Sequence, residues 1–155
     1  MKVRLDDIDW HILKELQNNG RITNVELARR VGISAPPCLR RVRALEEAGI
    51  IRGYRTLIDE KELGQDVTAF VLVGLSSQAE ADLVAFEELV RRWPYVRECH
   101  MLSGEVDFLL KCVAPDLRHF QTFIIEELTK AAHVASVKTM LTIRQSKDEA
   151  ALAIA

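Results

Sequence analysis

The sequence has few cysteines, and none is placed to hold a metal. Its three cysteines, Cys38, Cys99 and Cys112, are widely spaced, with no C-x-x-C pair and no matching histidine spacing. An odd number of scattered cysteines suits neither a disulfide framework nor a zinc site. We therefore expect no metal, no cofactor and a reducing cytoplasm.

Long apolar runs are also missing. A membrane-spanning helix needs about 20 apolar residues, whereas the longest run, residues 67–75, has the length of a strand. The first ten residues, MKVRLDDIDW, carry charges and no apolar core, so we expect no signal peptide. With 48% hydrophobic and 28% charged residues, the 155-residue chain is expected to be soluble, with one domain or two small ones.

Excess positive charge is absent from the chain as a whole, whose net charge is −2. The distribution is uneven: residues 1–60 hold 11 Lys and Arg against 9 Asp and Glu, and residues 61–155 hold 10 against 14. Residues 34–56 contain five Arg and two Glu. A local basic stripe on an acidic protein indicates one element that meets a polyanion, although a solvated helix face explains it equally well.

Three helices are predicted in the first fifty residues. In the first, apolar residues recur at helical spacing from Leu5 to Leu16, Asp6 or Asp7 can cap the start, and Asn19-Gly20 ends it. The second begins with a capping box of Thr23 and Glu26 and ends at Gly32. Only two residues then precede Ser34, the expected N-cap of a third helix that ends at Gly49.

The third helix has two contrasting faces. Leu39, Val42 and Leu45 form the expected apolar face, with Cys38 beside them. The opposite face is formed by Pro36, Pro37, Arg40, Arg43 and Ala44, flanked by Arg41. The two prolines fall in the first turn, where a missing N–H costs little.

Two short helices joined by a Gly-containing turn predict a helix-turn-helix, whose second helix enters the DNA major groove. The proline rings can contact thymine methyl groups, and Arg40 and Arg43 can reach base edges or phosphates. Arg52 and Arg55, in the β-prone segment 50–58, can add phosphate contacts from a wing or a linking strand. The alternative is a structural three-helix bundle that binds no DNA.

The remaining ninety residues predict strands at 67–75, 96–102, 108–113 and 137–143 and helices at 80–92 and after Asp116. The order β-α-β-β-α-β is the ferredoxin-like arrangement. Strand 67–75 is apolar on both faces, and two helices cover only one face of such a sheet. We therefore expect a second copy on the other face, in a homodimer that pairs two recognition helices on a palindromic site.

Three stretches carry a resemblance that spans nearly the whole chain: LDDIDWHILKELQNNGRITNVELARRVGIS, PPCLRRVRALEEAGIIRGY and ECHMLSGEVDFLLKCVAPDL. They resemble the leucine-responsive/asparagine-responsive (Lrp/AsnC) family of transcriptional regulators. The resemblance implies an α+β protein: a winged-helix-like helix-turn-helix reader of double-stranded DNA, joined to a ferredoxin-like small-molecule-sensing (RAM) domain. It also implies an amino-acid effector, dimers that assemble into tetramers or octamers, and a cytoplasmic, nucleoid-associated location.

The expected division is a DNA-binding domain at 1–50, a linking strand or hinge at 51–65, a sensing and oligomerisation domain at 66–147 and a tail at 148–155. Where the family commonly has Thr before the Pro-Cys of the recognition helix, this chain has Pro36, which removes one hydroxyl from the DNA face. The expected DNA-binding residues are Ser34, Pro36, Pro37, Arg40, Arg41, Arg43 and Arg52.

The family's Ser-Gly-Asp/Glu-x-Asp turn is intact at residues 103–107, and in relatives effectors bind near it, between dimers. The resemblance therefore implies effector-binding residues, with the last strand as a weaker contributor: Met101, Ser103, Gly104, Glu105, Asp107, Thr139 and Thr142. A bare backbone at Gly104 suits a ligand carboxylate, and Glu105 or Asp107 can pair with its ammonium. Without the resemblance, a plain hairpin turn is the simpler interpretation.

Two other functions are compatible with this fold. One is an enzyme of porphyrin metabolism, but the four histidines, His11, His100, His119 and His133, are scattered and form no nucleophile–base set, so we expect no enzymatic activity. The other is a ligand-sensing or assembly protein with weak DNA binding, against which the outward arginines of the third helix argue.

Overall fold

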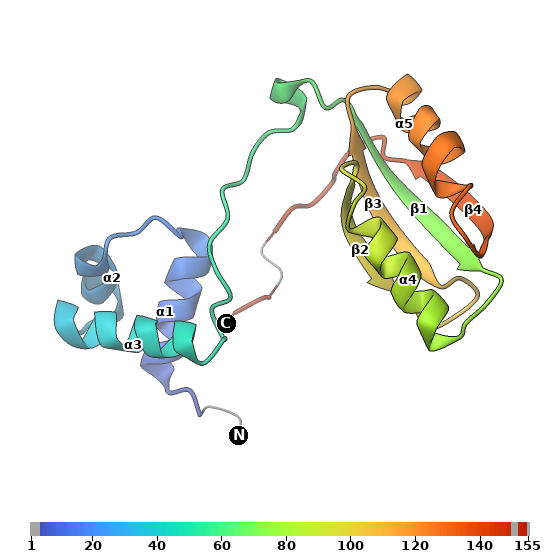
Figure 1. Cartoon of the computed structure of the whole chain (residues 1–155). Coiled ribbons are helices and arrows are strands. Elements are labelled where there is room, and N and C mark those ends of the chain that lie inside the picture. The colour runs from blue at the N-terminus through green and yellow to red at the C-terminus, as the bar shows by residue number, and fades with distance from the viewer. Residues whose placement is uncertain (1–3, 150–151, 155) are drawn as a thin grey trace. The chain divides into compact units, whose positions relative to one another are not determined.

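The computed structural model describes residues 4–149 and 152–154. The chain forms two compact units: the first runs to Leu57 and includes the segment from Lys147 onwards, and the second comprises Ile58–Ser146 (Figure 1). The chain passes from one unit to the other twice, between Leu57 and Ile58 and between Ser146 and Lys147. No helix among the described residues is long and apolar enough to cross a membrane.

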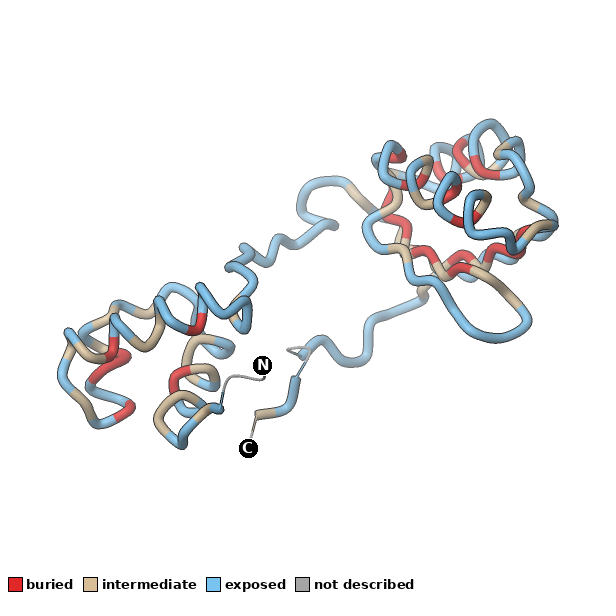
Figure 2. Tube along the Cα trace, turned by 60° about the horizontal axis from the view of Figure 1, so that its bottom comes forward, coloured by how far each residue is buried: buried red, intermediate tan, exposed pale blue. Residues whose placement is uncertain are grey.

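The first unit contains three helices, α1 (Asp7–Asn18), α2 (Asn24–Val31) and α3 (Ala35–Glu47). Asp6 caps α1 through a reciprocal pair of hydrogen bonds with Asp9, which settles the choice between Asp6 and Asp7. The three helices share a small core, shown in red in Figure 2. Its buried residues are Ile12, Leu27, Ala28, Val31, Cys38 and Leu45. The predicted helix-turn-helix is therefore confirmed in outline.

Two details of these helices differ from the prediction. Leu39 was expected on the apolar face of α3, yet its side chain is 38% exposed, because the buried stripe of α3 follows Cys38 and Leu45. At the start of α2, Thr23 accepts the expected hydrogen bond from the Glu26 amide. The return half of the capping box is not formed, because the Glu26 carboxylate binds Arg29 and Arg30 instead.

Ion pairs join α2 to α1 through a group that we call the Glu26 cluster: Glu15, Glu26, Arg29 and Arg30. Arg30 contacts Glu26 and also Glu15 of α1, each at 2.8 Å. Hydrogen bonds from Arg29, and then from Arg30, lower the pKa of Glu26 from 4.5 to about 2. A carboxylate with a lowered pKa contributes stability that is complete above its ordinary pKa and is lost as the pH falls through the lowered value.

We therefore expect the stability of Glu26→Gln to fall less on acidification than the stability of the natural chain. Between about pH 5 and pH 2.5, the urea midpoint of the helical circular-dichroism signal should fall further for the natural chain than for the variant. Glu47→Gln is the control, because Glu47 forms no ion pair among the described residues. Equal acid sensitivity in Glu26→Gln and the natural chain would contradict the role given to this cluster.

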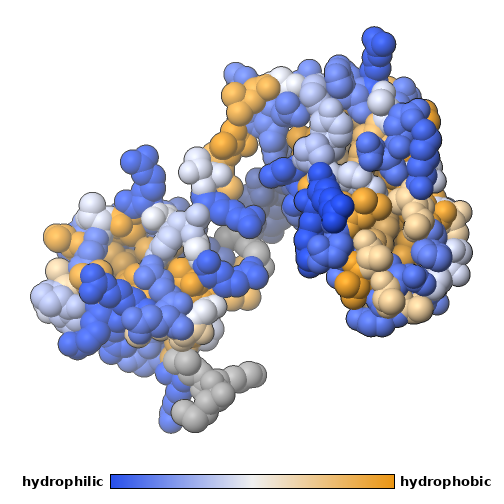
Figure 3. All heavy atoms as spheres, viewed as in Figure 1, coloured by the Kyte–Doolittle hydropathy of each residue, from blue (hydrophilic) through white to orange (hydrophobic). Residues whose placement is uncertain are grey.

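The segment after α3 does not form the strand that its composition favours. Residues 50–58 have no strand partner within the described chain, and Leu57 is 90% exposed. Figure 3 shows apolar atoms of this linker facing solvent. Tyr54 is the exception, since its hydroxyl donates to Glu46 at 3.0 Å and its ring lies against Gly20. A wing therefore does not form within one copy, and Tyr54 instead fastens the start of the linker to the helices.

The second unit is a four-stranded antiparallel sheet of order β2-β3-β1-β4 with helices on one face. This is the predicted ferredoxin-like topology. The elements follow one another as β1 (Val67–Leu75), α4 (Glu80–Val90), β2 (Val96–Met101), β3 (Phe108–Ala114), α5 (Leu117–Phe123) with a π turn (Ile124–Leu128), and β4 (Val134–Leu141).

The two faces of the sheet differ in what covers them. Ala69, Val71 and Val73 of β1 are fully buried beneath α4 and α5, together with Phe108 and Leu110 of β3. The alternate residues form what we call the open face, which no described helix covers (Figure 2). The open face includes Phe70, Leu72, Leu109, Lys111, Lys138 and Met140, with Glu98 and His100 of β2 along one edge. Its apolar centre lies on the two middle strands.

Candidate nucleic-acid interface and effector turn

The start of α3 is held by α2. The Asn24 side-chain amide donates to the Ala35 carbonyl at 2.8 Å, which fixes the first turn of α3 against the preceding helix. Ser34 occupies the N-cap position with extended backbone, but its hydroxyl makes no capping hydrogen bond. Pro36 and Pro37 follow in the first turn, and Pro36 is exposed. The N-terminal end of α3 therefore presents proline rings and a serine hydroxyl that is not used for capping.

One side of α3 forms a shallow hollow of about 450 Å³. Its lining residues are Pro36, Leu39, Arg40, Arg43, Ala44 and Glu47. Arg40 and Arg43 are exposed one turn apart, and neither forms an ion pair among the described residues. Arg52, beyond the end of α3, is also exposed. An unpaired guanidinium can bind a guanine edge or a phosphate with two parallel hydrogen bonds.

Arg41 differs from its neighbours, and the expectation that it points outward with them is wrong. Its guanidinium donates to Asp6 at 2.9 Å and to Asp9 at 2.8 Å, and only 31% of its side chain is exposed. Hydrogen bonding from the Asp9 amide, assisted by Arg41, lowers the pKa of Asp6. Arg41 therefore joins α3 to the N-terminal end of α1, where negative side chains are favourable.

The 103–107 turn joins β2 to β3 and is fixed by Asp107. The Leu102 amide donates to the Asp107 carbonyl at 2.8 Å, and the Asp107 amide donates to Val73 at 3.0 Å. One Asp107 carboxylate oxygen accepts a hydrogen bond from the Leu75 amide at 2.6 Å. Asp107 is therefore partly occupied in holding the turn to the end of β1, which leaves Glu105 as the freer carboxylate for a ligand ammonium.

The rest of the 103–107 turn is open. Ser103, Gly104 and Glu105 are exposed, as is Met101 at the end of β2. Gly104 has φ = 150°, a value that side-chain-bearing residues rarely adopt, and no atom lies within 4 Å of where its Cβ would be. The backbone at this position is therefore accessible to a ligand.

The two threonines of the last strand do not join this turn within one copy. Thr139 pairs with Val71 in the middle of β1, and the Thr142 amide donates to Thr68 at the beginning of β1. The 103–107 turn lies at the other end of β1, beside Val73 and Leu75. A site that combines the turn with Thr142 therefore requires two copies of the chain. The Thr142 hydroxyl is buried without a hydrogen-bond partner among the described residues.

The structure gives no support for cysteine reactivity or for metal binding among the described residues. Burial raises the pKa of Cys99 to about 11 and that of Cys112 to about 12, so neither thiol is readily ionised at neutral pH. The described residues contain no group of histidine, cysteine and carboxylate side chains that could hold a metal ion.

The architecture and these two surfaces define a helix-turn-helix regulator with a ligand-binding domain. The comparisons show the family: residues 5–52 match the winged helix-turn-helix DNA-binding family, and residues 68–152 match the Lrp/AsnC ligand binding domain. The chain belongs to the Lrp/AsnC family of transcriptional regulators.

Similar proteins match over nearly their whole length. The leucine-responsive regulatory protein of Rhizobium meliloti is 63% identical over 148 residues, which cover 96% of this chain and 95% of the relative. The protein of that name from Escherichia coli K12 is 39% identical, covering 97% and 92%. A Neisseria meningitidis transcriptional regulator in complex with L-Met has a TM-score of 0.92 and 37% identity, covering 97% of each chain.

Proposed function

We propose that this regulator binds double-stranded DNA through the α3 helices of two copies, and that an amino acid bound at the 103–107 turn changes its assembly. The observation that carries the proposal is the side of α3 on which Arg40 and Arg43 are exposed and form no ion pair with any described residue. Ser34, Pro36 and Pro37 would meet the major groove at the N-terminal end of α3, and Arg52 would contact a phosphate.

A second copy is the proposed occupant of the open face. Two β-sheets that pack face to face bury the alternate residues of both sheets, and an isologous interface pairs identical surfaces. Phe70, Leu72 and Leu109 would meet their equivalents at its centre, with Lys111 opposite Phe70 on β3 and Lys138 on the edge strand β4. Further association of dimers into tetramers or octamers would bring the 103–107 turn of one copy near β4 of another.

The proposed ligand is a free amino acid. Its carboxylate would bind the exposed backbone around Gly104, and its ammonium would pair with Glu105. The buried Thr142 hydroxyl supports a contribution from a neighbouring copy, because a ligand could satisfy it. Leucine and methionine are the first candidates, since relatives are named for a leucine response and for an L-Met complex.

Enzymatic activity is not part of the proposal. Ser77 donates a hydrogen bond to Asp82, whose other oxygen lies 3.5 Å from His133 Nε2. In a Ser-His-Asp triad the histidine stands between serine and carboxylate, so this order gives the serine no base. We propose that the protein acts as a regulator on DNA, in the cytoplasm and associated with the nucleoid.

An amino-acid screen tests the sensing half of this proposal. At millimolar concentration, at least one of the twenty amino acids should raise the melting temperature, by an amount equivalent to about 2.7 kcal/mol when its concentration is 100 times its Kd. The same amino acid should change the sedimentation coefficient, because a ligand that binds one assembly favours it. Glu105→Gln should weaken both responses, and Glu62→Gln in the linker is the control. If no amino acid changes either quantity, the sensing proposal fails.

A further inference from the structure

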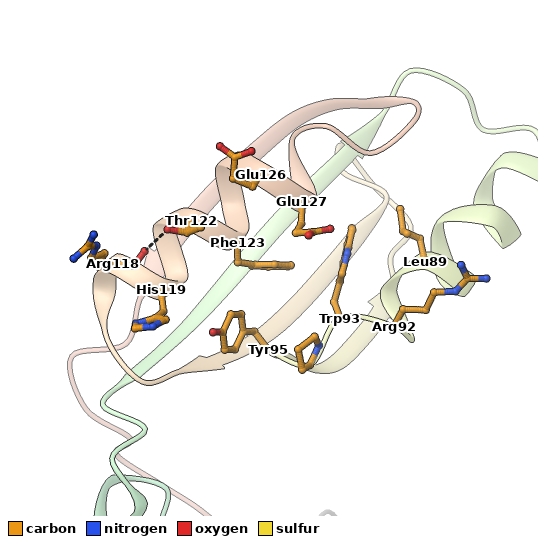
Figure 4. Close-up of a pocket in the computed structure, with 11 residues that line it drawn as sticks. Leu89, Arg92, Trp93, Tyr95, Arg118, His119, Thr122, Phe123, Glu126 and Glu127 are labelled. Atoms are coloured by element: carbon orange, nitrogen blue, oxygen red, sulfur yellow. Dashed lines mark hydrogen bonds between the residues drawn. The ribbon is translucent and has the colours of Figure 1, made fainter.

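The second unit contains a cavity that is larger than the hollow on α3 and separate from the 103–107 turn. We call it the α4–α5 groove; it has a volume of about 730 Å³ and lies between the end of α4, the start of β2 and the outer side of α5 (Figure 4). The turn follows the end of β2 at Met101, whereas the groove lies at its beginning, beside Tyr95. Six extended residues, about 20 Å of strand, separate the two places.

The floor of the groove is aromatic and rigid. Trp93 is 6% exposed and Phe123 is 4% exposed, and their ring centroids lie 5.4 Å apart in an edge-to-face arrangement. Tyr95 packs edge-to-face on the other side of Phe123 at 5.9 Å. Figure 4 shows these three rings side by side beneath α5. Such a floor is preformed for a flat apolar or aromatic group, because its rings are fixed by the core behind them.

The rim of the groove carries charges of both signs. Arg92 and Arg118 are exposed at the rim, and neither forms an ion pair among the described residues. His119 stands beside Arg118, with its Nδ1 held 2.9 Å from Asp116. On the α5 side, Glu126 is paired with Lys130, while Glu127 has no such partner among the described residues. Figure 4 shows Arg118 at one end of the groove and Arg92 at the other, so each end offers a guanidinium group to a carboxylate.

The α5 side of the groove departs from regular helix geometry. The π turn begins directly after Phe123, and the Thr129 amide donates to the Ile124 carbonyl at 3.0 Å, five residues back. A π turn inserts one residue into a helix and rotates the side chains that follow, and such turns occur frequently at functional sites. Glu126 and Glu127 both line the groove from within this turn.

We propose that the α4–α5 groove binds a small aromatic carboxylate, such as an aromatic amino acid or its analogue without the amino group. The ring would lie on Trp93 and Phe123, and the carboxylate would pair with Arg118 or Arg92. Glu127 is placed to accept an ammonium if the ligand has one. This site lies within one chain, so it requires neither the proposed dimer nor the proposed DNA contacts.

Calorimetric titration with three related compounds tests this chemistry. L-phenylalanine and 3-phenylpropionate should bind with Kd values of about 10 μM to 1 mM, and phenethylamine, which lacks the carboxylate, should bind at least about tenfold more weakly. Tighter binding of phenylalanine than of phenylpropionate, abolished by Glu127→Gln, would assign the ligand to the amino acids. Equal binding would assign it to carboxylates without an amino group. If neither carboxylate binds, or if phenethylamine binds as well as they do, the proposal is wrong.

Matched variants locate the site. Thr122 is exposed and lines the groove, so Thr122→Trp should fill it and abolish binding, whereas Gln121→Trp, exposed on α5 but outside the groove, should not. Either Arg118→Gln or Arg92→Gln should weaken binding about tenfold. Arg91→Gln, which removes the partner of Glu88, should leave it unchanged. Glu105→Gln should also leave it unchanged, which separates the groove from the 103–107 turn.

Two further outcomes would overturn the assignment. Binding of 3-phenylpropionate that survives Thr122→Trp would place the ligand elsewhere. A change in the sedimentation of the ligand-free protein caused by Thr122→Trp, with Gln121→Trp unchanged, would show that another copy of the chain occupies the groove. Fluorescence of Trp93 in a Trp10→Phe background gives an independent readout, because Trp93 is part of the floor.

Discussion

Leu72→Glu should convert the dimer into a monomer and reduce its affinity for an operator with two half-sites by about 100-fold or more. Leu72 lies at the centre of the open face, paired across the sheet with Leu109 and Lys138. A carboxylate there would lose its hydration if a second sheet packed on it, which is strongly unfavourable even with Lys138 on the neighbouring strand. Loss of the dimer then removes the second recognition helix, whose effective local concentration supplies most of the gain in affinity.

Sedimentation velocity and DNA-binding anisotropy measure this effect together. Val84→Glu is the control, because Val84 is an exposed apolar residue on α4, outside the open face. Met140→Glu, on the edge strand of the open face, should give a smaller shift toward monomer. Circular dichroism confirms that each variant is folded. If Leu72→Glu remains dimeric, the second copy does not lie on the open face.

The double substitution Arg40→Ala and Arg43→Ala should abolish specific DNA binding while the protein stays folded. An arginine that reads a guanine contributes about 1–3 kcal/mol, so each loss should weaken specific binding roughly 5- to 150-fold. Both side chains are exposed on α3, and within the described part of the chain neither forms an ion pair. Anisotropy with labelled DNA from upstream of the protein's own gene measures the loss.

Salt dependence distinguishes an arginine that reads a base from one that contacts only a phosphate. If one of them contacts only phosphate, its removal should weaken binding evenly across sequences and reduce the salt slope by about one. Arg29→Ala is the matched control, because Arg29 is an exposed arginine that pairs with Glu26 within α2. Unchanged affinity of the double variant at low salt would remove this side of α3 from the DNA interface.

Local sequence patterns were sufficient for most of the fold. The helical spacing from Leu5 to Leu16 and the stop at Asn19 depend on neighbours within a few residues, and so does the apolar strand Val67–Leu75. The change of period near residue 67 and the order of elements after it were enough to predict the ferredoxin-like sheet. These features are set by backbone hydrogen bonding and short-range side-chain periodicity.

Contacts between distant residues could not be predicted in the same way. Arg41 lies next to Arg40, but its partners Asp6 and Asp9 are more than thirty residues away, and only the packing of α1 on α3 brings them together. Strand register similarly separates Thr142 from the 103–107 turn. The α4–α5 groove was missed because its aromatic floor and charged rim come from segments that meet only in the folded unit.

Affinity cleavage tests most directly whether two copies of α3 enter the major groove. In a Cys99→Ser background, with Cys38 and Cys112 buried, Ser34→Cys carries an iron chelate at the start of α3. Two recognition helices should produce two cleavage centres in the major groove, one helical turn (about 10 bp) or a multiple of it apart. A single centre, or no cleavage by protein that is bound to the DNA, would contradict the placement of paired α3 helices on DNA.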